Sequence, residues 1–172
     1  MNRQLNIKII GAGPTGSLLA LAMVHVGAKV TICDKNDIYN IIDRNRSYAL
    51  THSSRKLLQD LDLWPDLTSS FLSPFSKLNV IDDSTNHSFC FTLKDLYPYK
   101  SEALGWIVDH RELMNYMLSK ISSNPAIKTQ FGTTNLDQSF YDLTLVADGP
   151  FSTSAKSLNI KKLELQYKQG CL

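Results

Sequence analysis

The sequence predicts an α/β domain built on a parallel sheet, and three observations near its start predict it. Residues 5–10 form a short isoleucine-rich run, which is typical of a strand. The motif Gly11-Ala-Gly13-Pro-Thr-Gly16 overlaps the start of residues 14–26, which are apolar all round, as in a buried helix. A second apolar run at 29–33 then ends at Asp34. Strand, helix and strand within about 30 residues predict a Rossmann-like βαβ unit.

The rest of the chain carries further short elements. Residues 36–46 are polar and lack periodicity, so we expect a loop there. Residues 53–63 have helical spacing, and Trp64-Pro65 is expected to end that helix because proline disfavours helix in the residue before it. Two runs at 78–81 and 88–92 flank a polar loop and predict an additional small β hairpin. The remaining pattern predicts a strand at 103–108, a helix at 111–121, and strands at 127–130 and 143–147.

Length and charge limit the function classes. A chain of 172 residues with 43% hydrophobic content can bury one core, so residues 1–172 are expected to form one domain. Lys and Arg number 18 against 16 Asp and Glu, which leaves no excess of positive charge to neutralise a phosphate backbone. We therefore expect no nucleic-acid partner.

The cysteines indicate a reducing compartment. Cys33, Cys90 and Cys171 are odd in number and far apart, and neither a C-x-x-C pair nor a histidine at ligand spacing accompanies them. We expect no metal site and a cytoplasmic protein. The apolar run 17–24 can imitate a signal peptide, but it is too short to span a bilayer, and three glycines and Pro14 precede it.

The glycine motif stands between a predicted strand and a predicted helix, where dinucleotide binding requires it. Gly11 lets the chain turn off the strand, Gly13 lets a pyrophosphate approach, and Gly16 lets the helix pack close to the sheet. The helix N-terminus then offers free N–H groups to the diphosphate. The predicted cofactor contacts here include the adjoining Pro14 and Thr15.

Asp34 ends the second predicted strand, 18 residues beyond Gly16, where an acid accepts hydrogen bonds from ribose hydroxyls. An acid there disfavours a 2′-phosphate, so the site suits NAD or the ADP half of FAD better than NADP. Lys35, the next residue, is also among the predicted cofactor contacts. Taken alone, Asp34 is equally typical of a surface carboxylate at a strand end.

Three further segments resemble the flavin-dependent aromatic hydroxylases, in particular those of ubiquinone biosynthesis. Arg46-Ser-Tyr-Ala-Leu50, with Leu61-Asp-Leu-Trp64 after it, resembles the arginine and Ala-Leu that follow the family's glycine motif. Gly105-Trp-Ile-Val-Asp-His-Arg-Glu-Leu113 resembles a family strand that leads to an arginine. Val146-Ala-Asp148-Gly149 resembles the family's Ala-Asp-Gly motif.

This resemblance implies an FAD-binding domain in which Arg46, Arg111, Asp148 and Gly149 contact the cofactor. It also implies NAD(P)H as a transient reductant and hydroxylation of a phenolic or polyprenyl-phenol ring. A lipid substrate of that kind implies peripheral association with a membrane. The family's catalytic groups are expected to lie outside this chain, so no catalytic residue is assigned.

Two departures from the family pattern bear on activity. Ala155 stands where the family has an arginine after its Asp-Gly motif. The family also continues with a substrate-facing sheet, whereas this sequence ends at Leu172. We therefore expect a truncated, N-terminal portion of a hydroxylase, inactive alone, that self-associates or pairs with a separately encoded C-terminal half.

Two other functions remain open. The same glycines and Asp34 serve an NAD-dependent dehydrogenase equally well, and a nucleotide-binding fragment without turnover is the non-enzymatic alternative. Arg46, Arg111 and Asp148-Gly149 also have ordinary structural interpretations, respectively as a solvated loop charge, a helix-start residue paired with Asp109 or Glu112, and a turn. His110 is interpreted as an ordinary strand-end histidine, and His25, His52 and His87 are weaker candidates for acid–base chemistry.

Overall fold

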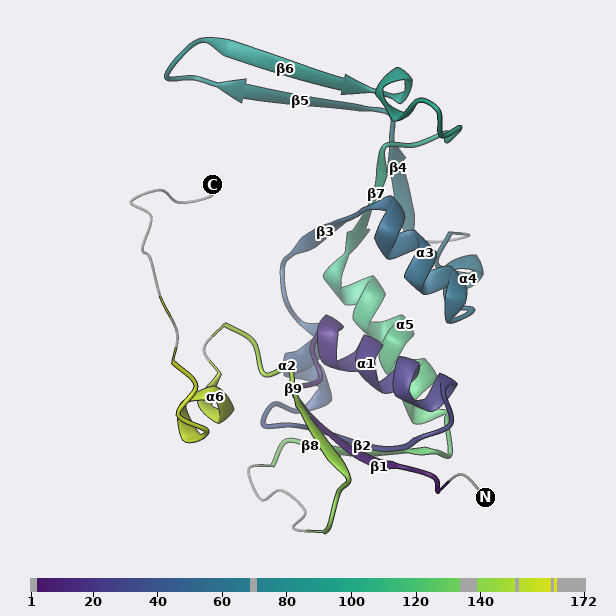
Figure 1. Ribbon diagram of the computed structural model, residues 1–172, viewed down its shortest axis with the longest axis vertical. Coiled ribbons are helices and arrows are strands. Elements are labelled where there is room, and N and C mark those ends of the chain that lie inside the picture. Colours follow the sequence, from purple (N-terminus) through teal and green to yellow (C-terminus); the bar gives the residue numbers. More distant parts are fainter. Residues whose placement is uncertain (1–2, 69–70, 134–138, 151, 162, 164–172) are drawn as a thin grey trace.

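The computed structural model describes residues 3–68, 71–133, 139–150, 152–161 and 163, and in these residues it contains three sheets. The predicted α/β class, parallel sheet and added hairpin are confirmed. Figure 1 shows the parallel sheet at one end of the molecule and the hairpin at the other. The chain order of the elements is β1 (Asn6–Ile10), α1 (Pro14–His25), β2 (Lys29–Asp34), α2 (Ile38–Ile42), β3 (Ser47–Leu50), α3 (His52–Asp60), α4 (Trp64–Thr68), β4 (Leu72–Phe75), β5 (Lys77–Asp82), β6 (His87–Thr92), a 3₁₀ turn (Leu93–Leu96), β7 (Gly105–Asp109), α5 (His110–Ser122), β8 (Ile127–Phe131), β9 (Leu143–Val146) and α6 (Thr153–Ser157).

The four-stranded parallel sheet has the order β8-β2-β1-β9. The chain leaves β1 through α1 to β2 on one side, and β9 later joins β1 on the other side. The strand order therefore reverses between β1 and β9. In open α/β sheets the crevice at the carboxyl ends of the strands beside such a reversal is where ligands bind.

Helices α1 and α5 lie side by side over one face of this sheet (Figure 1). Period-2 alternation turns Ile7 and Ile9 of β1 and Val30 and Ile32 of β2 toward these helices, where all four are buried. Burying side chains of this size contributes about 1.5–3 kcal/mol each. This core fixes the N-terminus of α1 at the carboxyl edge of the sheet.

A second core lies between α3, α4 and the antiparallel sheet β3-β7-β4. Trp64 and Trp106 meet edge to face with ring centroids 4.9 Å apart, and both are buried. The guanidinium of Arg55 lies over both rings, 5.5 Å from Trp64 and 5.2 Å from Trp106. Such aromatic and cation–π contacts stabilise the junction of the helices and the sheet.

The hairpin β5–β6 projects from the body of the molecule (Figure 1). Its register pairs Leu78 with Phe91 and Val80 with Phe89, which places four apolar side chains on one face. These side chains remain 46–62% exposed. An exposed apolar face favours association, so the expected self-association of the chain stays a prediction.

Two sequence predictions about local structure are wrong. The segment 36–46, expected to be a loop, contains α2, which the Asp37 carboxylate caps by accepting a bond from Asn40 N at 2.8 Å. Trp64-Pro65 begins α4 rather than ending α3, because proline fits a first helical turn, where no intrahelical N–H bond is needed. Helix α3 instead ends at Asp60, and Asp62 turns the chain with φ +55°.

His110 is the first residue of α5, and its side chain is fully buried. Its Nε2 lies 2.9 Å from the Ile41 carbonyl oxygen, which can only accept, so this nitrogen carries the proton. In the neutral ring with its proton on Nε2, Nδ1 accepts from the Tyr48 hydroxyl at 2.8 Å. The ring therefore ties α2 and β3 to α5, which supports the structural interpretation of this histidine.

Replacing His110 by alanine is expected to lower the free energy of unfolding by about 2–4 kcal/mol, because it leaves a cavity and an unpaired buried acceptor. Urea unfolding followed by circular dichroism measures the change. The exposed His87→Ala is the matched control and is expected to stay within about 0.5 kcal/mol of the parent. Equal stability of the two variants would show that the hydrogen bonds from His110 to Ile41 and Tyr48 do not stabilise the fold.

Candidate cofactor-binding site

Gly11 and Gly16 are glycines because of backbone packing. Gly11 has φ +102°, and a Cβ there would lie 2.3 Å from the Ala147 carbonyl oxygen. A Cβ on Gly16 would lie 1.8 Å from the Gly11 carbonyl oxygen. Gly11 N also donates to the Cys33 carbonyl at 2.7 Å. These two glycines let β1, β9 and α1 converge at the point where the strand order reverses.

Gly13 differs from them, because a Cβ there would meet no atom of the described residues within 4 Å. Gly13 is the N-cap of α1, Pro14 opens the helix, and no side chain in the described part of the chain caps this end. The first helical bond runs from Ser17 N to Gly13 O at 2.9 Å, so the N–H groups of Thr15 and Gly16 precede it. The open space and these N–H groups together suit an anionic group such as a diphosphate.

The Asp34 carboxylate lies beside this loop and is held by three donors. Its Oδ2 accepts from Ala12 N at 2.8 Å. Its Oδ1 accepts from Asn36 N at 2.9 Å and from Asn36 Nδ2 at 3.0 Å. A carboxylate offers about four lone-pair sites, so capacity remains on Oδ2 for one more donor, such as a ribose hydroxyl. Lys35 is exposed next to it.

Asp148 and Gly149 follow β9 at the same edge of the sheet. Gly149 has φ +87°, which turns the chain away from the strand. Asp148 Oδ2 accepts from Ser154 N at 3.1 Å, whereas its Oδ1 is buried without a hydrogen-bond partner among the described residues. A buried acceptor of this kind needs a donor from elsewhere.

Burial acts to raise the pKa of Asp148, but hydrogen bonding by Ser152 and Ser154 outweighs it and holds the pKa below its ordinary value. The carboxylate is therefore ionised at neutral pH. Ala155, which occupies the place of the family's arginine, is buried in α6, and its N–H donates to Ser152 Oγ at 2.9 Å.

Arg46 and Arg111 lie together in a second group. The Arg46 carbonyl accepts from His110 N at 2.8 Å, and the Arg46 side chain is exposed. Arg111 pairs with Asp43 at 2.8 Å, with about half of each side chain exposed. The expected pairing of the Arg111 side chain with Asp109 or Glu112 is replaced by this one, and Asp109 Oδ1 instead caps α5 through Arg111 N at 2.8 Å.

The structure thus brings most of the predicted cofactor contacts to one edge of the parallel sheet, namely Gly11, Gly13, Pro14, Thr15, Gly16, Asp34, Lys35, Asp148 and Gly149. Arg46 and Arg111 belong instead to the segments that open β3 and α5. Their assignment as cofactor contacts stays a prediction. Asn36, which contacts Asp34, and Asp43, which pairs with Arg111, were not predicted from the sequence. The one sequence signal for them is that each is a polar residue in a segment that follows β2 or α2.

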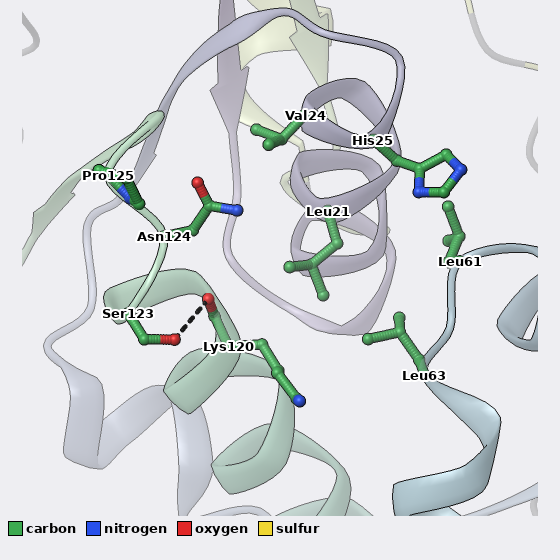
Figure 2. Close-up of a pocket in the computed structure, with 9 residues that line it drawn as sticks. All are labelled: Leu21, Val24, His25, Leu61, Leu63, Lys120, Ser123, Asn124 and Pro125. Atoms are coloured by element: carbon green, nitrogen blue, oxygen red, sulfur yellow. Dashed lines mark hydrogen bonds between the residues drawn. The ribbon is translucent and has the colours of Figure 1, made fainter.

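A pocket in the described residues lies away from these groups (Figure 2). It is open to solvent and has a volume of about 320 Å³, between the C-terminal ends of α1 and α5 and the turn before α4. Helix α1 has 12 residues and is therefore about 18 Å long, which separates this cavity from the glycine loop at the other end. The cavity is lined by Leu21, Val24, His25, Leu61, Leu63, Lys120, Ser123, Asn124 and Pro125, and it contains none of the predicted site residues.

No group of three or more histidine, cysteine or acidic side chains in the described residues lies close enough to hold a metal ion. Of the helices that the structure describes, none has the length and apolar content to cross a bilayer.

Curated proteins with similar sequences include two hydroxylases whose names refer to ubiquinone or a ubiquinol. Ubiquinone hydroxylase UbiM of Neisseria meningitidis is 26% identical over 122 residues, which cover 69% of this chain and 24% of that protein. The 3-demethoxyubiquinol 3-hydroxylase of Escherichia coli is 22% identical over 191 aligned positions, which cover 99% of this chain and 48% of that protein. The chain thus spans between about a quarter and a half of these relatives. No family model matches the sequence.

Solved structures with the same fold include Pseudomonas aeruginosa PqsL in complex with 2-aminobenzoylacetate, with a TM-score of 0.71 and 18% identity over 96% of this chain and 48% of that one. Pseudomonas putida p-nitrophenol 4-monooxygenase PnpA has a TM-score of 0.70 and 14% identity over 92% and 44% of the two chains. Klebsiella pneumoniae HpxO, solved with FAD and uric acid, has a TM-score of 0.56 and 19% identity over 74% and 31%.

The described residues fit FAD on three observations. The space at Gly13 is open, Asp34 keeps acceptor capacity, and Asp148 Oδ1 is buried without a partner in the described chain. These sequence similarities and the shared fold support an FAD-dependent hydroxylase family for this chain.

Proposed function

We propose that this chain is the FAD-binding portion of a flavin-dependent monooxygenase that hydroxylates a phenolic or polyprenyl-phenol ring, with NAD(P)H as the reductant. The observation that carries the proposal is the convergence of the glycine loop, Asp34 and Asp148 at the reversal of the strand order. The names of the curated relatives support the reaction class and the ring type.

Each group has a role that follows from its chemistry. The N–H groups at the start of α1 would bind the pyrophosphate, and Gly13 would let it approach the backbone. Asp34 would accept a hydrogen bond from the adenosine ribose, and Asp148 would accept one from a donor on the cofactor. Bound FAD would supply the redox chemistry, in which NAD(P)H provides two electrons and O2 provides the oxygen atom.

The experiment that tests the function is a flavin absorbance spectrum of the purified protein, with the extracted cofactor identified by mass. FAD at near one per chain supports the proposal. Bound NAD in place of flavin would indicate the dehydrogenase alternative. A chain that binds ADP but neither flavin nor NAD would be the non-catalytic nucleotide-binding fragment.

The proposal also includes the aromatic substrate, a separately encoded C-terminal half and peripheral association with a membrane.

Replacing Asp34 by alanine is expected to weaken FAD binding by about 1.5–3 kcal/mol, the range for a hydrogen bond to a charged group. The variant is also expected to lose part of its preference for ADP over 2′,5′-ADP, because the carboxylate no longer repels a 2′-phosphate. Isothermal titration calorimetry measures both effects. Asp83→Ala in the exposed hairpin turn is the control and should bind like the parent. Unchanged affinity in Asp34→Ala would remove this residue from the site.

A further inference from the structure

Asn36 lies in the segment between β2 and α2 and takes part in three hydrogen bonds. Its backbone N–H and its side-chain amide both donate to Asp34 Oδ1, at 2.9 and 3.0 Å. Its carbonyl accepts from Gly132 N at 2.9 Å, which fastens the segment to the residue after β8. Asn36 therefore connects the ends of two neighbouring strands, β2 and β8, and touches the acid that ends one of them.

We infer that Asn36 is the positioning residue of the adenosine-ribose subsite, where it holds the Asp34 carboxylate so that Oδ2 is presented to the ribose 2′-hydroxyl. This inference rests on the proposed function. It assigns to the pair of Asp34 and Asn36 the recognition that sequence reasoning assigned to Asp34 alone.

The inference rests on which donors bind each oxygen of the Asp34 carboxylate. The two Asn36 donors occupy Oδ1, and Ala12 N occupies one site on Oδ2 at 2.8 Å. Donors on both oxygens restrict rotation of the carboxylate about its Cβ–Cγ bond. The remaining acceptor site lies on Oδ2, the oxygen beside the glycine loop, where the adenosine end of a dinucleotide would lie.

The side chain of Asn36 can be tested apart from its backbone. Alanine at this position keeps the backbone donor to Oδ1 and the carbonyl bond to Gly132, and it removes only the amide donor. Without the amide donor to Oδ1, the Asp34 carboxylate can rotate more freely. Its Oδ2 is then no longer held toward the ribose, while the fold is kept. Serine restores a short donor two residues after the acid.

The test compares binding of ADP and of 2′-deoxy-ADP by calorimetry. The parent is expected to prefer ADP, and Asn36→Ala is expected to bind ADP about 3- to 10-fold more weakly, the range for one hydrogen bond. Binding of 2′-deoxy-ADP should be unchanged, because this ligand lacks the hydroxyl that Asp34 accepts from. Asn36→Ser should recover part of the loss, and the exposed Asn40→Ala should match the parent.

A double-mutant cycle separates positioning from a general structural role. In an Asp34→Ala background, Asn36→Ala is expected to have no further effect on ADP affinity. Equal weakening of ADP and 2′-deoxy-ADP, or an additive loss in the double variant, would overturn the inference. A parent chain that binds neither ADP nor FAD would instead refute the proposed function, so the two failures are distinguishable.

Discussion

Replacing Gly13 with valine is expected to abolish FAD binding and to leave the folded structure intact. The backbone of Gly13 has φ −67° and ψ −176°, which a β-branched residue adopts without strain. Its Cβ would meet no described atom within 4 Å, so the new side chain would fill the space in front of the N–H groups of Thr15 and Gly16. A pyrophosphate displaced from those groups loses its charge-assisted bonds to the backbone.

The other two glycines of the motif provide the contrast. Gly11→Ala and Gly16→Ala would place a Cβ 2.3 and 1.8 Å from backbone oxygens, so both are expected to disrupt the folded state itself. Flavin absorbance after desalting measures binding, and circular dichroism with thermal unfolding measures the fold. Normal FAD binding by Gly13→Val would refute the site, and unfolding of that variant would show that Gly13 is a packing glycine like the others.

The βαβ unit could be predicted from the sequence because its signals are local. The glycine spacing, the apolar runs and the terminal acid lie within one continuous segment, and they placed α1 and the end of β2 within one residue of their observed bounds. The chemistry of Gly11 and Gly16 is also local, since a side chain at either would collide with backbone brought together by the same motif.

Elements that depend on distant partners could not be predicted in this way. Strand β3 forms because it pairs with β7, with Ser47 opposite Asp109 and Leu50 opposite Trp106, and four residues alone carry no strand signal. Strand β4 forms on the other side of β7 for the same reason. Helix α2 has five residues, and its length leaves no room for a periodic pattern.

The same distinction applies to the candidate site. Asp34 was predictable because its distance from the glycines follows from the length of one helix and one strand. The partner of Arg111 was not predictable, because Asp43 reaches it only through the docking of α2 on α5. Nearby acids in the sequence, Asp109 and Glu112, are attractive partners for a helix-start arginine, but one of them is engaged in capping the helix.

Given FAD, NAD(P)H and a phenol, the 172-residue chain by itself is expected to release hydrogen peroxide and to form no hydroxylated product at an enzyme-like rate. Hydroxylation requires a ring held next to the flavin, and a displacement of about 1 Å can cost about a hundredfold in rate. Two pockets of the described residues lie at the C-terminal ends of α1 and α5 and around Leu93–Ser101. Neither of these pockets adjoins the glycine loop, and the PnpA and PqsL chains, which share this fold, are about twice as long.

When no phenol ring is bound next to the flavin, water has access to the flavin. The two electrons from NAD(P)H, with two protons, then reduce O2 to hydrogen peroxide. The expected signature is slow NAD(P)H oxidation matched by peroxide, measured by nucleotide absorbance, a peroxidase-coupled assay and chromatography of the phenol. Gly13→Val is the control, because without bound FAD it should oxidise NAD(P)H no faster than free FAD does. A polypeptide that supplies the rest of the hydroxylase should convert peroxide release into product formation. Stoichiometric phenol hydroxylation by the chain alone would contradict the expectation and would mean that the ring binds among residues assigned no role in catalysis.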